Sequence, residues 1–207
     1  MHELTLKANF EVWRDYSVRK SKVDFLRFSE TIFERDNYTC QFCGFQSKHY
    51  QEIIDLNDNY KKFDIASSVT TCCFCAQCFF LESVGIGNFG GGTLIYLPEI
   101  SQANLNSFCH ILFSAIAKNN DHKANAELIY RNLRFRTQQV EEQFGEGTSD
   151  PSAFGQLLIE TNFYSVDMAF KKAIHENIRL LPSSARFKVQ IEKWLETAFS
   201  DSAIDEN

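Results

Sequence analysis

Cysteines in two closely spaced groups are the residues of this chain whose type and spacing predict a defined chemistry. A C-x-x-C turn directs two thiolates at one metal ion, so two such turns supply the four sulfur ligands of a tetrahedral zinc site. Four protein ligands leave no position for a reacting water, and we therefore expect one structural zinc ion per chain. The two groups are Cys40 with Cys43, and Cys72 with Cys73, Cys75 and Cys78.

The second group offers two ways to complete the zinc site. Cys72 with Cys75 repeats the C-x-Phe-C-small pattern of the first pair, with Ala76 in the place of Gly44. Cys75 with Cys78 gives a longer loop and leaves Cys72 at the end of a strand. The cysteine spacing allows both choices. The candidate zinc ligands are Cys40, Cys43, Cys72, Cys75 and Cys78.

Disulfide bonds or buried free thiols are the alternative interpretations of these cysteines. The chain has seven cysteines, an odd number, and its first residues lack the apolar core of a signal peptide. We therefore expect a reducing cytosol, where paired cysteines usually bind metal. Cys73 and Cys109 have no obvious metal partner and are expected to be small buried residues. A redox-sensing zinc protein that uses Cys73 or Cys78 is a further alternative.

The composition of the chain favours a globular protein and argues against two classes of function. Its 207 residues, 44% of them hydrophobic, are enough for one domain or two small ones. A net charge of −6 argues against nucleic-acid binding. No apolar stretch approaches the roughly 20 residues of a membrane helix, so we expect no direct membrane insertion. Twenty Phe indicate a well-filled core or a surface for a protein partner.

The segments around the cysteines show the patterns of elements that would hold them. A helix is expected over residues 21–36, short strands over 51–56 and 66–71, and a second helix from about 75 to 84. The order is therefore helix, cysteine pair, strand, loop, strand, cysteine pair and helix. The glycine-rich stretch 85–92 lacks a following Lys-Ser/Thr pair, so it indicates a hinge rather than a phosphate-binding loop.

The second half of the chain has the periodicity of helices. Behind a Ser101 cap, apolar residues continue along one helical face, and His110 lies off that face and is expected at the surface. After a short strand over 93–97, further helices are expected over 122–144, from Pro151, over 166–178 and over 185–199. The predicted fold class is α+β, with a zinc-binding module over 1–97 and a mostly helical region over 98–207, as two domains or one.

The segment Phe33–Gly44, which reads FERDNYTCQFCG, resembles the start of the zinc module of HNH endonucleases. The stretch Ser68–Cys72 is similar to the strand that precedes the second cysteine pair in that family. The resemblance covers roughly residues 22–84 and implies the ββα-metal fold, in which a hairpin is followed by a helix. It also favours Cys72 and Cys75 as the second pair.

The resemblance to HNH endonucleases does not extend to their catalytic residues. Those nucleases need an Asp-His pair on the first strand, in which the His activates water and the Asp binds a divalent metal. Here Asp55 occupies the Asp position, and Leu56 stands where the base belongs. Because leucine cannot accept a proton and His49 precedes the strand, no catalytic residue is predicted.

Over its whole length the chain resembles a family of HNH-like subunits of the type IV coupling complex in Dot/Icm type IVB secretion systems. The resemblance implies a non-enzymatic cytoplasmic protein that binds the C-terminal tail of the coupling ATPase DotL. It also implies DotM, IcmS and IcmW as partners in one complex at the inner membrane, which presents effectors for translocation. The main alternative is a divergent HNH nuclease or DNA-binding protein.

Aromatic residues beside the glycine-rich hinge are the candidates for a groove that receives such a tail. Their alternative role is to pack the two halves of the chain together. The four residues are Phe79, Phe80, Phe89 and Tyr96.

Overall fold

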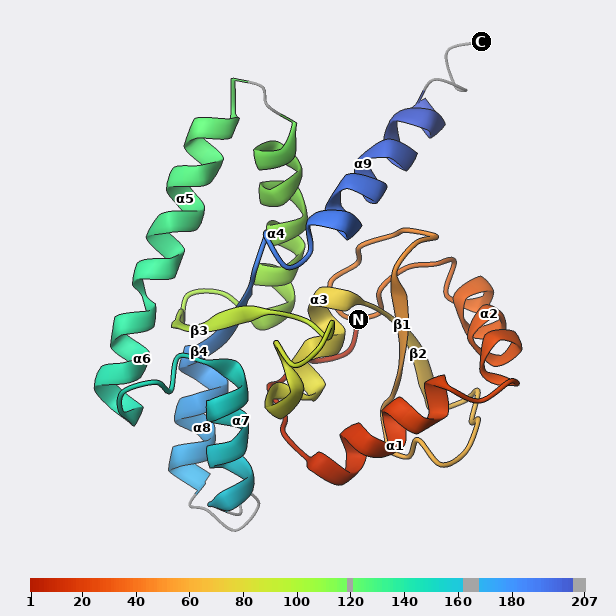
Figure 1. Ribbon diagram of the computed structural model, residues 1–207, viewed down its shortest axis with the longest axis horizontal. Helices are drawn as coiled ribbons and strands as arrows, with labels where there is room; N and C mark the ends of the chain where they lie inside the picture. Colours follow the sequence, from red (N-terminus) through yellow and green to blue (C-terminus); the bar gives the residue numbers. More distant parts are fainter. Residues whose placement is uncertain (119–120, 162–167, 203–207) are drawn as a thin grey trace.

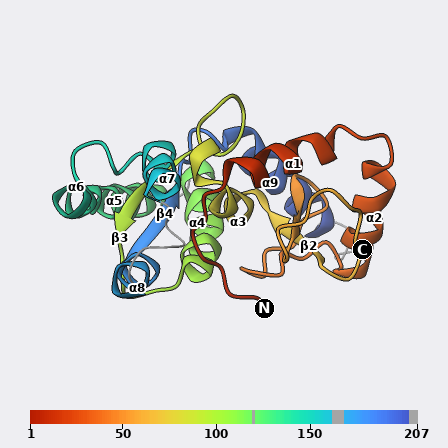
Figure 2. The same ribbon diagram turned by 90° about the horizontal axis from the view of Figure 1, so that it is seen from below.

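The computed structural model describes residues 1–118, 121–161 and 168–202 (Figure 1). It mixes helices with two antiparallel two-stranded sheets, in agreement with the predicted α+β class. Both views place α1, α2 and the first sheet on one side of α3, and the helices α5 to α8 with the second sheet on the other (Figures 1 and 2). The cysteine-rich segment therefore lies where the two halves of the molecule meet.

The first half contains two helices, a hairpin and a short third helix. Its elements are α1 (Phe10–Lys20), α2 (Phe25–Arg35), β1 (Gln51–Asp55), β2 (Ser68–Cys72) and α3 (Cys73–Ala76).

Helix α1 was not predicted, because its buried face is not a stripe of apolar residues. Phe10 and Val18 are exposed, whereas Arg19 is fully buried. The Arg19 Nη2 atom donates to the carbonyl oxygen of Ile53 at 2.8 Å, and the guanidinium lies over the ring of Tyr60 at 4.5 Å. A charged side chain therefore attaches α1 to β1.

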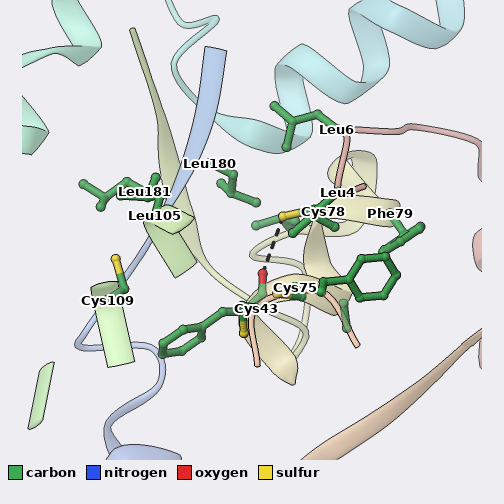
Figure 3. Close-up of a cluster of buried hydrophobic side chains, with 14 of the residues drawn as sticks. Leu4, Leu6, Cys43, Cys75, Cys78, Phe79, Leu105, Cys109, Leu180 and Leu181 are labelled. Atoms are coloured by element: carbon green, nitrogen blue, oxygen red, sulfur yellow. Dashed lines mark hydrogen bonds between the residues drawn. The ribbon is translucent and has the colours of Figure 1, made fainter. Parts of the chain in front are cut away.

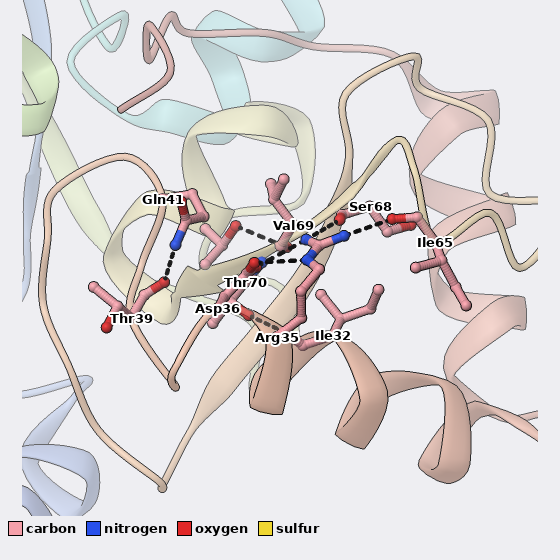
Figure 4. Close-up of polar contacts among 10 residues, drawn as sticks. Ile32, Arg35, Asp36, Thr39, Gln41, Ile65, Ser68, Val69 and Thr70 are labelled. Atoms are coloured by element: carbon pink, nitrogen blue, oxygen red, sulfur yellow. Dashed lines mark hydrogen bonds and ion pairs between the residues drawn. The ribbon is translucent and has the colours of Figure 1, made fainter.

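The predicted strands over 51–56 and 66–71 form the β1–β2 hairpin, in which Gln51 lies opposite Cys72. The end of α2 is tied to β2 by two charged side chains (Figure 4). Arg35 donates from Nη2 to the carbonyl oxygen of Ser68 at 2.7 Å, and Asp36 accepts from the backbone N–H of Thr70 at 2.8 Å. These bonds fix the strand that ends at the second cysteine group.

The helix expected from 75 to 84 is much shorter than predicted. Regular α-helix covers only α3, and the 3-10 turns Gln77–Phe79 and Leu81–Ser83 follow it. Phe80 interrupts the helical backbone with φ −142° and ψ 56°. The second turn packs against α7, where a Cβ on Gly155 would lie 2.3 Å from the backbone nitrogen of Glu82.

The second sheet joins distant parts of the sequence. Strand β3 (Gly92–Tyr96) pairs antiparallel with β4 (Ile178–Pro182), so an element of the predicted 1–97 module pairs with one of the 98–207 region. Strand β4 was not predicted. The helix expected over 166–178 corresponds to α8 (Met168–Asn177), its residues 166–167 lie outside the described part, and Ile178 belongs to the strand.

The remaining helices follow the sequence pattern with one interruption. The helix expected over 122–144 is divided at Arg136, whose carbonyl oxygen accepts from the backbone N–H of Tyr96 at 3.2 Å. The cap of α4 was predicted correctly, because the Ser101 side chain accepts from the Asn104 backbone N–H. The helices are α4 (Gln102–Ala117), α5 (Lys123–Phe135), α6 (Thr137–Phe144), α7 (Pro151–Glu160) and α9 (Lys188–Ser202).

One large hydrophobic core takes side chains from both halves of the chain, including Phe74, Phe80, Phe113 and Phe154. Among the aromatic residues beside the hinge, Phe79 and Phe80 are buried, so these two pack the interior instead of lining an open groove. Within the described ranges, we find no helix with the length and apolar character needed to cross a bilayer.

Candidate metal centre

Four buried cysteines from the two predicted groups come together in one place. The sulfur atoms of Cys40, Cys43, Cys72 and Cys75 all lie within 4.8 Å of one another. The sulfurs of Cys43 and Cys72 are 3.6 Å apart. Thiolates bound tetrahedrally at about 2.3 Å from zinc lie roughly 3.8 Å from each other, so these four sulfurs are close enough together to hold one metal ion.

The first pair is held by a tight turn. The Gly44 backbone N–H donates to the Cys40 carbonyl oxygen at 3.0 Å, and Gly44 has φ +77°, a conformation that favours glycine. The Gln41 backbone N–H donates to the Thr70 carbonyl oxygen at 2.9 Å, which anchors the turn on β2. Because β2 ends at Cys72 and α3 contains Cys75, the hairpin brings both pairs together.

Cys78 lies outside the group of four. Its Sγ donates to the carbonyl oxygen of Phe74, four residues earlier in α3, at 3.5 Å (Figure 3). The surplus Cys109 is buried, and Cys73 is half-buried. Of the two pairs that the spacing allowed, the geometry brings Cys72 and Cys75 to the first pair.

The thiol pKa values show how burial and the neighbouring sulfurs affect ionisation in this cluster. Burial tends to raise the pKa of Cys40, but hydrogen bonds from Cys43, Cys72 and Cys75 outweigh it and hold this pKa well below its usual range. Burial, together with hydrogen bonds to Cys40 and Cys43, raises the pKa of Cys72 and Cys75 well above theirs. Burial and the neighbouring sulfurs therefore disfavour ionisation of Cys72 and Cys75. A divalent cation would let all four ionise, and four sulfur donors without a carboxylate are typical of structural zinc sites.

Helix α4 adds two polar side chains that the sequence did not indicate. His110 was expected at the surface, and this prediction is wrong, because the ring is only 7% exposed and its Nε2 lies 3.3 Å from the sulfur of Cys72. Asn106 Nδ2 donates to the sulfur of Cys75 at 3.2 Å. Burial lowers the pKa of His110 to about 3, so the imidazole is neutral. Their spacing of four residues was the available signal, because it places both on one helical face.

Asp55, which the resemblance to HNH endonucleases placed at the position of their metal-binding Asp, has a structural role here. It is fully buried, and its Oδ1 accepts from the backbone N–H of Asn57 at 2.9 Å. Its Oδ2 accepts from the Ser67 hydroxyl at 2.7 Å. Leu56 is half-buried and packs against the main core. Both carboxylate oxygens therefore hold the loop that connects β1 and β2.

The comparison with known proteins decides the family. No family model matches the chain. A protein of Legionella pneumophila described as Type 4 apparatus protein DotN is 53% identical over 201 residues, which cover 97% of this chain and 93% of that protein. The chain belongs to the DotN family. Because the match covers nearly the whole chain, it includes both the cysteine-rich half and the helical half.

Proposed function

We propose that this protein is a non-enzymatic, zinc-stabilised subunit of the type IV coupling complex in a Dot/Icm type IVB secretion system. The observation that carries the proposal is the 53% identity to DotN over almost the full length of both chains. In this role the protein is cytoplasmic and peripheral at the inner membrane through its partners. It binds the C-terminal tail of the coupling ATPase DotL, in a complex with DotM, IcmS and IcmW.

One zinc ion bound by Cys40, Cys43, Cys72 and Cys75 stabilises the fold in this proposal. The order of helix α2, cysteine pair, hairpin, cysteine pair and helix α3 supports an HNH-like ββα-metal module. Absence of nuclease activity is supported by the surroundings of Asp55, whose two carboxylate oxygens accept hydrogen bonds from the loop, and by Leu56 at the position of the base. The zinc in such a site is structural, because four cysteines fill its coordination.

The glycine-rich hinge is the proposed contact for the DotL tail. Phe80 is fully buried there, whereas Phe89 is half-buried and Ile86 is 62% exposed. Ile86 and Phe89 are neighbours in a turn in which the Phe89 backbone N–H donates to the Ile86 carbonyl oxygen at 3.1 Å. Exposed apolar side chains of this kind contribute to recognition of a partner peptide.

Direct binding of the DotL tail to the zinc-loaded protein tests the proposal. We expect the wild-type protein to bind the tail at micromolar concentration or tighter, and Ile86→Asp to weaken binding at least about 10-fold without lowering Tm. Val189→Asp is the matched control, because Val189 is also an exposed apolar residue, at 63%, but lies on α9. If the wild-type protein does not bind, the assignment to this complex is wrong. If Ile86→Asp binds like wild type, the assignment stands and the hinge is not the contact.

A further inference from the structure

Helix α4 directs three buried polar side chains toward the cysteine cluster and β4. Gln102, Asn106 and His110 are 3%, 0% and 7% exposed. They follow each other at intervals of four residues, so they lie in a row along one face of the helix. Burying a polar side chain costs free energy unless its hydrogen bonds are satisfied. Each of these three side chains therefore needs a hydrogen-bond partner in the interior.

A chain of hydrogen bonds leads from β4 to Cys75. The Leu180 backbone N–H donates to Gln102 Oε1 at 2.7 Å, Gln102 Nε2 donates to Asn106 Oδ1 at 2.9 Å, and Asn106 Nδ2 donates to Cys75 Sγ at 3.2 Å. The Leu180 backbone N–H can only donate, and the Leu180 carbonyl oxygen, which accepts from Gln102 Nε2 at 2.8 Å, can only accept, so Leu180 fixes the orientation of the Gln102 amide. That orientation in turn fixes the Asn106 amide with its NH₂ group toward the Cys75 sulfur, and the Cys78 sulfur lies farther from Nδ2, at 3.9 Å.

His110 makes the equivalent contact with the other cysteine of the second pair. Its Nε2 lies 3.3 Å from Cys72 Sγ. The ring is stacked on Phe45 at a centroid distance of 3.6 Å and on Phe74 at 4.3 Å, which fixes its plane. A thiolate bound to metal carries no proton, so in the metal-loaded site the imidazole must be the donor, through its Nε2–H.

Four thiolates around one divalent cation leave a net charge of −2 in the protein interior. Such a charge is costly to bury, and N–H groups directed at the sulfurs reduce the cost. In metal sites, partners of this kind change metal affinity by about 10- to 100-fold.

We propose that Asn106 and His110 are positioning residues of the metal centre, which stabilise the thiolates of Cys75 and Cys72, with Gln102 fixing the orientation of Asn106. The inference rests on the metal centre proposed above. It makes the packing of α4 against β4 part of the metal site, so that the helical half of the chain contributes to metal binding although it supplies no ligand to the metal.

The test measures zinc affinity and the spectrum of the cobalt-substituted protein for full-length variants. Asn106→Leu removes one donor with little change in volume, and His110→Phe removes the other while keeping an aromatic ring. We expect each to lower zinc affinity by about 10- to 100-fold in competition with a chromogenic chelator. We also expect the sulfur-to-cobalt charge-transfer band to move to longer wavelength, because a thiolate without its N–H donor gives up an electron more readily. Gln102→Leu should also lower zinc affinity and move the charge-transfer band to longer wavelength, but both changes should be smaller than those of Asn106→Leu.

The controls separate this inference from a purely structural effect. Asn104→Leu, at an exposed position of the same helix, should leave affinity and spectrum unchanged. His110→Gln, which restores an N–H donor, should recover most of the wild-type spectrum. Asn106→Ala, which adds no bulk, replaces Asn106→Leu if leucine prevents folding. Wild-type affinity and spectrum in the Asn106 and His110 variants would overturn the inference alone. A wild-type protein that binds no metal would overturn the proposed metal centre itself.

Discussion

Cys72 and Cys78 offered the same spacing relative to Cys75, and their surroundings in the fold distinguish them. The sulfur of Cys72 lies with those of the first pair, whereas the sulfur of Cys78 donates to the Phe74 carbonyl oxygen. We predict that Cys72→Ser lowers the zinc content well below one ion per chain and unfolds the cysteine-rich half, because metal binding and folding are linked. Cys78→Ser should retain one zinc and the wild-type circular dichroism spectrum. Elemental analysis of both purified variants checks this, and the reverse result would move the fourth ligand to Cys78.

Glu82 makes stability depend on pH. It is buried beside α7, and burial raises its pKa from 4.5 to about 7, outweighing the backbone N–H groups of Glu82 and Asn9, which lower it. Because the folded-state pKa lies above the unfolded one, the folded state binds the proton more tightly. The carboxyl therefore destabilises the fold progressively as pH rises from about 4.5 through about 7.

Replacing Glu82 with glutamine should remove this dependence. We predict that Glu82→Gln is more stable than wild type at pH 8, by on the order of 2 kcal/mol, and that its advantage shrinks at pH 6. Urea unfolding of the zinc-loaded proteins at both pH values measures the difference. Glu127→Gln, at an exposed position, is the control for the substitution itself. An advantage of equal size at pH 6 and pH 8 would contradict the titration of Glu82.

In the candidate metal centre, the residues whose signal is local could be predicted from the sequence. The C-x-x-C spacing is a property of a few consecutive residues, and it indicated the cysteines without knowledge of the fold. The environment of His110 depends on Phe45 and Phe74, which come from elsewhere in the chain, and on Trp194 from α9. A residue whose burial is created by distant segments gives no pattern in its own neighbourhood, so His110 was expected at the surface.

Helix α7 and the 3-10 turn at Leu81–Ser83 approach so closely that only glycine fits between them. A Cβ on Gly155 would lie 2.3 Å from the backbone nitrogen of Glu82 and 2.8 Å from its Cα. Helix propensity alone favours Gly→Ala inside a helix by about 1 kcal/mol. The contact is with backbone, which cannot rotate away, so we predict that Gly155→Ala destabilises the protein by roughly 1–3 kcal/mol.

Chemical unfolding of Gly155→Ala distinguishes the two effects. Helix propensity would raise the free energy of unfolding, whereas the contact with the Glu82 backbone would lower it. Gln156→Ala, at the next and exposed position of α7, is the control and should stay within about 0.5 kcal/mol of wild type. A gain in stability for Gly155→Ala would mean that a Cβ at this position does not meet the backbone of Glu82.

Two helices that begin with a capping residue, α4 and α7, were predicted correctly at their start. Elements that form only through contacts with distant segments of the chain were not predicted. Ser101 caps α4 and Asp150 caps α7, each by accepting backbone N–H bonds from the first turn, and both starts were recognised. Strand β4 exists because it pairs with β3, and α1 because Arg19 reaches the carbonyl of Ile53. The division between α5 and α6 likewise follows from the bond that Arg136 makes with β3.

At the scale of the whole molecule, the two regions on either side of the boundary expected near residue 97 share a sheet and several side-chain contacts. The β3–β4 sheet crosses it, as do the contacts of Asn106 and His110 with the cysteine cluster. Phe74, next to Cys75, packs against Phe187, and the centroids of the two rings are 4.8 Å apart. The apolar core is therefore completed only when both halves are present.

We accordingly predict that residues 1–97 do not fold alone, even with zinc supplied. The isolated fragment would expose the core face of α3, leave β3 without its partner strand and remove the N–H donors of two thiolates. Co-expression with residues 98–207 should restore a soluble complex that contains one zinc, because the missing strand and helices are then supplied in trans. Zinc content and amide dispersion in the NMR spectrum of the fragment provide the measurement. A fragment 1–97 with dispersed amide signals and one bound zinc would establish two independent domains, and α4 would then be dispensable for the metal centre.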